Sequence, residues 1–373
     1  MSRERLLIHL RPWCHALLLS IPLLMYSSAQ AMQYVPAALA AAIPLVVMFV
    51  LLPLIDALIG RESINLPEYQ FTWLERRLLP LLCLPAQAAM LWWGIPFGID
   101  LPLPAAILWF TSMGVIGGIV AINVAHELIH RRSRLDRIAG GLLLSLVNYS
   151  GFKVEHLRSH HLYVATPKDA STAHLNQSAY HFVLTSLWRN PQRAWQLEAA
   201  RLQRQGLSSW HWQNELLWWH GVSVILALIA LGLWGAFGLL AFVMQGVLAA
   251  ATLEVINYVE HYGLMRQKID GRYEAPNEHH SWNSDYFLSN AILLQLQRHA
   301  DHHAHPLRSF PYLRHRDSAP QLPLGYAAMF VLALLPPLWR QVMNPRVKEY
   351  AVNLHSSVDK TALEVNNAPP SRP

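Results

Sequence analysis

The chain has 373 residues, of which 53% are hydrophobic and 14% are charged, and its formal net charge is +6 with a pI near 9.4. Soluble domains carry roughly 25% charged residues, so this composition argues against an ordinary soluble enzyme and favours a membrane protein. No basic patch interleaved with aromatic residues stands on a soluble module, which argues against nucleic-acid binding. The positive charge instead suits a surface that rests on anionic membrane lipid and faces acidic partners.

Long apolar runs without lysine or arginine predict the membrane helices. A helix needs about 20 such residues to cross the hydrocarbon core of a bilayer. We therefore predict an all-α integral membrane protein with six transmembrane helices and a cytoplasmic cap rich in histidine. The predicted spans are residues 13–33, 36–58, 78–97, 103–130, 214–233 and 236–260.

These spans divide the chain into alternating membrane and cytoplasmic parts. The first four form two hairpins, which turn near residues 33–36 and 98–102, and the last two turn near residues 234–236. The predicted parts are a cytoplasmic N-terminus (1–12), transmembrane helices 1–4 (13–130), a cytoplasmic segment (131–213), transmembrane helices 5 and 6 (214–260), a second cytoplasmic segment (261–348) and a disordered tail (349–373).

Two further apolar runs are interpreted as interfacial. Residues 138–152 are too few to cross a bilayer and return. Residues 322–342 are interrupted by Pro336-Pro337, and Arg346 and Lys348 follow at once. We therefore prefer an interfacial hairpin to a seventh span in this second run.

Basic residues in the short loops predict the orientation. Arginines precede the first span and follow the second, whereas the turns near residues 33–36, 98–102 and 234–236 contain no lysine or arginine. The positive-inside rule then puts both termini in the cytoplasm. Ala29-Gln30-Ala31 resembles a signal-peptide cleavage site, but a second apolar run follows at once, so we expect the first helix to be retained.

Histidines in four arrays carry the candidate chemistry. His126 and His130 are four residues apart at the end of the fourth span, so on a helix they share one face and can reach a common metal ion. All four arrays lie at the predicted cytoplasmic side. The nine histidines are His126, His130, His156, His160, His161, His261, His299, His302 and His303.

Nine imidazoles are too many for one zinc ion. Alone, His126-Glu127-Leu128-Ile129-His130 is a zincin signature, and a hydrolytic zinc needs three protein ligands and an open position. Shared between two ions, nine imidazoles give four or five per ion, which suits iron because iron takes roughly five or six ligands and leaves a position for oxygen. The two cysteines, Cys14 and Cys83, lie in predicted spans and form no Cys-x-x-Cys site. The sequence thus predicts a non-haem di-iron centre.

Acidic residues beside the arrays are candidates for orienting the ligand rings. A histidine ligand needs an acceptor for its second ring N–H group. We expect Glu127, Asp169, Glu260 and Asp301 to support catalysis by accepting hydrogen bonds from the ligand rings. Glu155 and Glu254 are further candidates for this role. The roles of His279 and His280 stay open at this point.

A redox centre at the edge of an apolar bundle favours a substrate drawn from the bilayer. The aromatic residues Trp92, Trp93 and Trp109 and the small residues near Gly114 and Gly118 are candidates for its channel. Ordinary helix packing is the preferred explanation for any single one of them, since glycines at this spacing let helices approach closely.

The four arrays and their neighbours resemble the histidine boxes of the membrane alkane 1-monooxygenases, which belong to the membrane fatty-acid desaturase and hydroxylase superfamily. The segments that carry the resemblance are residues 126–130, 155–161, 257–263 and 296–303. The Asn-Tyr-x-Glu-His-Tyr-Gly box favours hydrocarbon monooxygenases, and Leu-Gln-Arg-His with residues 281–286 favours alkane enzymes over xylene monooxygenases. The chain departs from the family at Arg131, where lysine is usual, and at Ser159, where glycine is usual. Neither change removes a ligand.

The resemblance implies a di-iron enzyme of the bacterial cytoplasmic membrane that hydroxylates the terminal methyl group of n-alkanes to primary alcohols. It implies O2 as oxidant and rubredoxin, reduced by a rubredoxin reductase, as electron donor. A rubredoxin needs four cysteines, and this chain has two, so the donor is expected to be a separate protein that docks on the cytoplasmic face.

Three alternatives share part of this pattern. A related membrane di-iron enzyme would act on xylene-type aromatics or on fatty acyl chains. An intramembrane zinc protease would need only His126, Glu127, His130 and one more ligand, and would not need His299. A metal transporter would carry ligands across the whole membrane, whereas the nine histidines lie toward one side.

Overall fold

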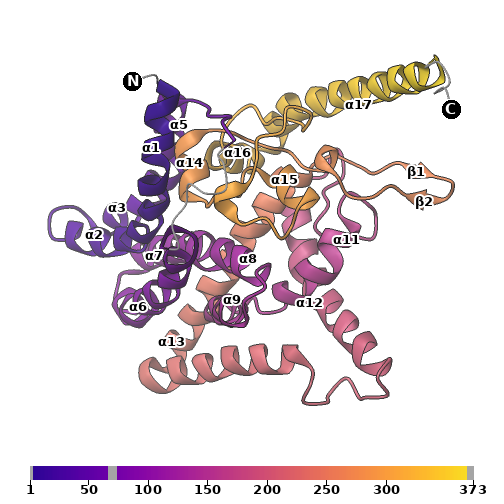
Figure 1. Cartoon of the computed structure of the whole chain (residues 1–373). Coiled ribbons are helices and arrows are strands. Elements are labelled where there is room, and N and C mark those ends of the chain that lie inside the picture. The colour runs from indigo at the N-terminus through magenta and orange to yellow at the C-terminus, as the bar shows by residue number, and fades with distance from the viewer. Residues whose placement is uncertain (1–2, 66–73, 368–373) are drawn as a thin grey trace.

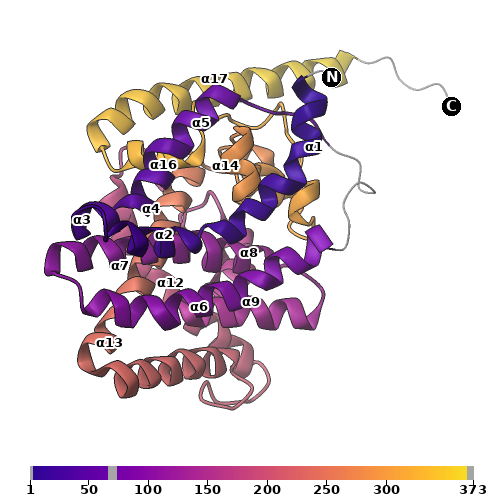
Figure 2. The ribbon, with the colours of Figure 1, turned by 90° about the vertical axis from the view of Figure 1, so that its left-hand side faces the viewer.

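The computed structural model describes residues 3–65 and 74–367 as a mostly helical structure. Its centre is one continuous apolar helix built from α7 (Leu103–Gly117), the π-helical turn η5 (Gly118–Ile122) and α8 (Asn123–Ile129). Other helices surround this element on several sides (Figures 1 and 2). A two-stranded hairpin, β1 (Lys268–Ile269) and β2 (Arg272–Tyr273), is a small departure from the predicted all-α fold.

Helices long and apolar enough to cross a membrane number three within the described residues: Arg76–Ile99, Leu103–Ile129 and Glu215–His261. The first contains α6 (Leu79–Ile99) and the last is α13 (Glu215–His261). Gly235 breaks α13 with a φ of +68°, a left-handed conformation that glycine adopts without a steric penalty. Figure 1 shows the two halves of α13 running in different directions from this break, which lies where the sequence predicts a turn.

The first two predicted spans, residues 13–33 and 36–58, are not continuous helices. The first is interrupted around Pro22 and the second at Ala42, two residues before Pro44. Pro44 stands in the first turn of α4, where the N–H group that proline lacks has no partner within the helix. Residues 43–59 form a shorter apolar helix. The six-span count therefore stays a prediction. The pieces are α1 (Arg3–Ala16), η1 (Leu17–Ser20), α2 (Leu23–Ala31), α3 (Ala37–Ala41), α4 (Ile43–Val46), η2 (Val47–Leu51) and α5 (Leu52–Ile59).

The segments between the apolar helices carry short and long helices of their own. Ser133, Ser178 and Asn214 begin α9, α12 and α13, because their side chains accept hydrogen bonds from N–H groups of the first turns. The elements not yet given are η4 (Leu74–Leu78), α9 (Arg134–Leu146), α10 (Phe152–Glu155), η6 (His156–His160), α11 (His161–Tyr163), α12 (Ala179–Gln203), η7 (Glu278–His280), α14 (Phe287–Ile292), α15 (His299–Ala304), η8 (Phe310–Tyr312), α16 (Tyr326–Ala333) and α17 (Pro336–Asn367).

The C-terminal region differs in part from expectation. The apolar run 322–342 divides at Pro336 into α16 and α17, as the double proline predicts. Residues 349–367, expected to be disordered, continue α17, since the stretch after Pro345 contains no proline or glycine before Pro369. The remainder of the predicted tail, residues 368–373, lies outside the described residues.

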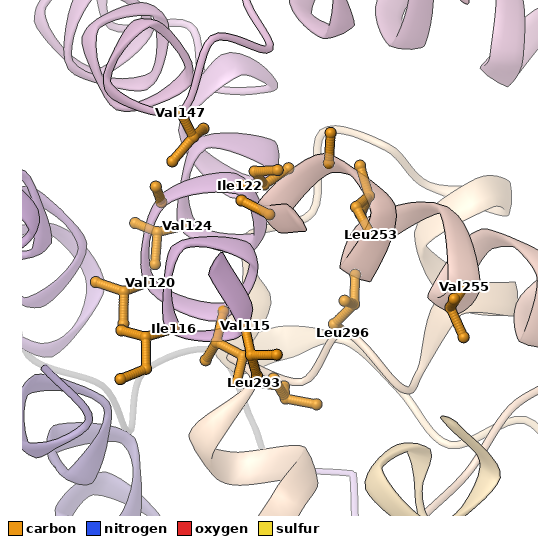
Figure 3. Close-up of a cluster of buried hydrophobic side chains, with 14 of the residues drawn as sticks. Val115, Ile116, Val120, Ile122, Val124, Val147, Leu253, Val255, Leu293 and Leu296 are labelled. Carbon is orange, nitrogen blue, oxygen red and sulfur yellow. The ribbon is translucent and has the colours of Figure 1, made fainter. Parts of the chain in front are cut away.

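The core lies where α13 packs against the central helix. Val115, Ile122 and Leu253 are among its buried side chains, and Figure 3 shows Leu253 of α13 and Leu296 facing each other beside the central helix. Glycines allow this packing: a Cβ atom on Gly114 would lie 2.3 Å from the Cβ of Leu248. The packing interpretation of the glycines thus accounts for Gly114.

The close approach at Gly246 gives a prediction about stability. A Cβ atom on Gly246 would lie 2.6 Å from the carbonyl oxygen of Val147, and backbone cannot yield as a flexible side chain does. We expect Gly246→Ala to destabilise the fold by about 1–3 kcal/mol, as overpacking does. Thermal unfolding in detergent measures it as a Tm lower by several degrees. Gly232→Ala in the same helix is the control, because a Cβ atom there would meet nothing within 4 Å. Equal Tm values for the two variants would contradict this account.

Candidate metal centre

The fold brings all nine histidines of the four arrays together in two adjacent groups. In each group the ligand atoms all lie within 4.8 Å of one another. The five-histidine group contains His126, His130, His156, His161 and His302. The four-histidine group contains His160, His261, His299 and His303.

A π-helical turn explains how the second array serves both groups. In an α-helix, residues four apart share a face, which would pair His156 with His160. Residues 156–160 form a π-helix, in which hydrogen bonds join residues five apart. His156 and His161, five apart, therefore belong to the five-histidine group, and His160 belongs to the other. The sequence did not reveal this local change of helix type.

Distances between ring nitrogens show how closely the five-histidine group converges. The Nε2 atom of His156 lies 2.9 Å from that of His130 and 3.0 Å from that of His161. The Nε2 atoms of His161 and His302 are 3.1 Å apart. His130 and His161 are partly exposed, whereas the other three rings are buried. This group is thus the one that faces solvent.

The four-histidine group converges equally closely but is fully buried. The Nε2 atom of His299 lies 3.2 Å from that of His261 and 3.0 Å from that of His303. The two groups are neighbours, since the ring centroids of His161 and His303 are 4.5 Å apart.

Hydrogen bonds orient two rings of the four-histidine group. His160 donates from Nδ1 to Asp169 at 3.0 Å, and Asp169 also accepts from the Thr172 hydroxyl at 2.6 Å. Burial alone would raise the pKa of Asp169, but His160 and Thr172 hold it below its usual value. His261 donates from Nδ1 to the backbone carbonyl of His280 at 3.2 Å. Each contact leaves Nε2 directed into the group, as a metal ligand requires.

The other carboxylates that were predicted to orient ligand rings have different partners. Glu127 accepts from the Arg131 side chain at 3.0 and 2.9 Å, and Asp301 accepts from Arg308 at 2.6 Å and from Arg316 at 2.8 Å. These carboxylates anchor arginines close to the arrays. Glu260 lies elsewhere, with its Oε2 atom 3.2 Å from Nε2 of His299.

Two buried acids form a polar cluster behind the centre. Glu254 accepts from Asn190 at 3.0 Å and from Asn257 at 3.1 Å. Burial, together with the nearby Asp169 and Glu254 carboxylates, raises the pKa of Glu155 well above its usual value. Glu254 thus binds amides and not a ligand ring.

Arginines inside the arrays fix the segments that carry the ligands. Arg158, between His156 and His160, forms an ion pair with Glu215 at 2.6 Å and another with Glu198. Burial alone would raise the pKa of Glu198, but Arg201 and Arg158 lower it to about 2. This network ties η6 to α12 and to the start of α13.

Arg298 fixes the start of α15. It is buried and donates to the carbonyl oxygens of Leu313 at 2.8 Å and Glu62 at 3.0 Å. Leu294 and Gln295, just upstream, have φ values of +53° and +59°, a strained conformation that recurs at functional sites.

His279 and His280, whose roles the sequence does not predict, belong to neither histidine group. His280 contacts Glu274 through Nε2 at 3.2 Å, and His279 contacts the Tyr350 hydroxyl through Nδ1 at 2.6 Å. His280 contributes to the centre only through its backbone carbonyl, which holds His261.

The donor set fits metal cations. Burial, followed by the neighbouring rings, lowers the pKa of five of the histidines well below the usual value, so their rings are neutral and their lone pairs are free to bind a cation. These five are His156, His161, His299, His302 and His303. The Nε2 atoms of His126 and His160 are buried and have no hydrogen-bond partner among the described residues. Such unpaired buried atoms are costly unless a cation satisfies them.

Two apolar cavities lie among the helices that carry the histidine arrays. An inner cavity of about 60 Å³ reaches Asn123, three residues before His126, and Leu296, three residues before His299. An outer cavity of about 500 Å³ shares four lining residues with the inner one: Phe49, Val115, Thr252 and Phe330. Phe49 and Phe330 stack at 4.7 Å between ring centroids. The sequence missed these aromatic residues, because neither carries a motif.

The tryptophans suggested from sequence take a packing role. Trp93 packs edge-on against Trp109 with ring centroids 5.6 Å apart, and Trp109 donates from Nε1 to the Gly94 carbonyl oxygen at 2.8 Å. They join α6 to α7. Gly118 does line the inner cavity.

Long apolar helices and two histidine groups are typical of helical membrane metalloproteins. Comparisons with known proteins identify the family within this class. A family model described as fatty acid desaturase matches residues 100–333. Alkane 1-monooxygenase 2 of Pseudomonas aeruginosa is 46% identical over 314 residues, which cover 82% of this chain and 83% of that protein. Alkane 1-monooxygenase 2 of Alcanivorax borkumensis is 43% identical over 86% of each chain. The xylene/toluene monooxygenase hydroxylase component of Pseudomonas putida is 31% identical over 64% of each chain.

The chain therefore belongs to the fatty acid desaturase family and, within it, to the alkane 1-monooxygenases. The resemblance seen in the histidine boxes is confirmed by similarity over most of the chain.

Loss of one ring from the five-histidine group gives a prediction about metal content. We expect His302→Ala to bind about one metal ion fewer per chain than the unaltered protein, since one ring of a converging group is lost. Elemental analysis of the purified protein measures the ratio. His181→Ala is the matched control, because His181 is exposed and lies outside both groups. An unchanged metal content in His302→Ala would show that the group does not bind metal as a unit.

Proposed function

We propose that this protein is a non-haem di-iron monooxygenase that hydroxylates the terminal methyl group of n-alkanes to primary alcohols. One oxygen atom of O2 enters the alcohol and the other leaves as water, which consumes two electrons and two protons. The observation that carries the proposal is an apolar cavity whose lining residues Asn123 and Leu296 stand three residues before His126 and His299 of the nine converging histidines. The similarity to alkane 1-monooxygenases over four fifths of the chain supports the substrate class.

Two iron ions are the metals that this donor set supports best. We propose that all nine histidines are ligands, that the five- and four-histidine groups each hold one ion, and that Asp169 orients His160. Structural zinc is bound by four ligands, so a group of five imidazoles disfavours it. Iron bound there would supply the activation of O2 and the abstraction of hydrogen from the substrate.

The protein's own residues bind and position the alkane. Val115 lies where the two cavities meet and Phe330 lines both, so an extended chain would lie between α7, α13 and α16 with its end near Leu296. Burial of the hydrocarbon drives binding, and the apolar walls exclude water from the reacting end.

The runner-up function keeps the same metal site with a different substrate. Xylene-type aromatics or fatty acyl chains would also enter an apolar cavity. Identity to the xylene/toluene enzyme component is 31% over 64% of the chain, against 46% over 82% for an alkane enzyme. Alkanes are therefore the preferred class. A zinc protease is disfavoured, because His299 and His303 form a second group that such an enzyme does not need.

A separate rubredoxin, reduced by a rubredoxin reductase, is the proposed electron donor. The five-histidine group reaches the surface at His130 and His161, which makes this face the shortest way in for electrons. Arg132 and Arg134 are exposed just beyond His130 and would attract an acidic donor.

We also propose a location in the bacterial cytoplasmic membrane, with six spans and with both termini and the metal centre in the cytoplasm. The exposed apolar side chains on the first half of α13, among them Ile225 and Leu228, support contact with lipid. The basic residues around residue 61 and residues 76–77 support the cytoplasmic orientation.

Product analysis tests the proposed function. Cells that express the chain with a rubredoxin system should convert octane or hexadecane to the corresponding 1-alkanol, as measured by gas chromatography. Val115→Phe should reduce conversion at least severalfold at unchanged metal content, because the larger ring fills the junction of the cavities. Val224→Phe is the control, since Val224 is exposed on α13. Formation of a desaturated or subterminally hydroxylated product in place of the 1-alkanol would overturn the proposal.

Charge reversal tests the docking face. Arg132→Glu should raise the KM for rubredoxin severalfold, leave metal content unchanged and weaken the salt dependence of the reaction, since a charge that attracts the donor is reversed. Steady-state kinetics at varied rubredoxin concentration measure these changes. Arg346→Glu on α17 should leave the KM unaltered. If both variants behave alike, the donor docks elsewhere.

A further inference from the structure

We propose that the carboxylate of Glu260 is a metal ligand of the four-histidine group, so that each of the two groups offers five donors. This inference rests on the proposed two-metal function. It also changes the role expected for Glu260, from orienting a ligand ring to binding the metal ion itself.

The position of the carboxylate carries the inference. Glu260 is on the last turn of α13, next to His261, and its Oε2 atom lies 3.2 Å from Nε2 of His299. That nitrogen is the one that faces the Nε2 atoms of His261 and His303, at 3.2 and 3.0 Å. The carboxylate oxygen is therefore on the side of the ring from which a metal would be bound.

A carboxylate that only orients a ring approaches the other nitrogen. Asp169 does so, because it accepts from Nδ1 of His160 and leaves Nε2 toward the group. The Nδ1 atom of His299 is buried and has no hydrogen-bond partner among the described residues. Glu260 and Asp169 thus stand on opposite sides of their rings.

The charge of Glu260 is not balanced by a basic side chain. Among the described residues, Glu260 forms no ion pair with arginine or lysine, whereas Glu127 pairs with Arg131 and Asp301 with Arg308. Its side chain is 2% exposed, and its Oε1 atom has no hydrogen-bond partner within the described part of the chain. A buried carboxylate without a positive partner is costly, and a divalent cation in the four-histidine group would supply the missing charge.

The donor count supports the same assignment. Five nitrogens form one group and four nitrogens form the other, and the Glu260 oxygen, 3.2 Å from Nε2 of His299, would be the fifth donor of the second group. Carboxylate and imidazole together suit iron. The Tyr326 hydroxyl lies beside the Glu260 carboxylate, and Tyr326 also lines the inner cavity. The metal that Glu260 binds is thus the one nearer the substrate, and the five-histidine metal is the one nearer the surface.

Glu260→Gln tests the inference, because it keeps the size of the side chain and removes its charge. We expect it to bind the second metal ion 10–100-fold more weakly, as shown by titration of the metal-free protein with Fe(II) followed by elemental analysis. In the Mössbauer spectrum of the iron-loaded protein, one of two iron signals should change or disappear while the other stays. Glu254→Gln is the matched control, since Glu254 is equally buried on the same helix but binds Asn190 and Asn257. Both signals should be unchanged in this control.

The outcomes separate the inference from the proposed function. Two irons of unaltered affinity and unaltered spectrum in Glu260→Gln would overturn the ligand role and leave the di-iron function standing. A native protein that binds no second metal would overturn both. If Glu260→Gln fails to fold, Glu260→Asp replaces it: the shorter carboxylate keeps the charge but withdraws the oxygen, so it should shift the same iron signal, and an unshifted spectrum would count against the inference.

Discussion

Burial of many neutral imidazoles with unpaired nitrogens is the constraint on which the rest of the structure depends. Nε2 atoms of separate arrays approach within 3.2 Å of one another, and those of His126 and His160 have no partner among the described residues. Without a cation this arrangement loses hydrogen bonds to water and gains little in return. The arrangement makes sense only as a site that metal ions complete, so metal binding and the local fold should be coupled.

The residues around the centre keep most water away from it, and they differ from one side of the centre to the other. The Arg158 and Arg298 networks tie the second and fourth arrays to α12, α13 and the loop near Glu62, while the central helix supplies His126 from within the apolar core. The five-histidine group reaches the surface at His130 and His161, whereas the inner cavity is lined mainly by apolar residues of the helix core. Electrons and substrate can therefore reach the centre by different ways, which suits an oxygenase that must exclude water from its substrate.

Sequence alone predicted the helical class, the long apolar helices from residue 78 onward, the break near Gly235 and the gathering of the nine histidines. Spacing sufficed there, because apolar runs and i, i+4 pairs are local patterns. It could not divide the rings between the groups, since that depends on the π-helical turn at residues 156–160. It also could not show that Glu260 faces His299, because a partner 39 residues away in sequence decides where that carboxylate points. The cavity residues Phe49 and Phe330 were missed for the same reason. Glu127 and Asp301 bind arginines that are close in sequence, Arg131 and Arg308, in place of ligand rings.

X-ray absorption spectroscopy at the iron edge, combined with the iron content of the purified chain, tests the central claim most directly. The account predicts two iron ions per chain, each surrounded by a shell of nitrogen and oxygen donors with the outer scattering of several imidazole rings. A single zinc ion per chain, or iron in a shell dominated by carboxylate oxygen or sulfur, would contradict it.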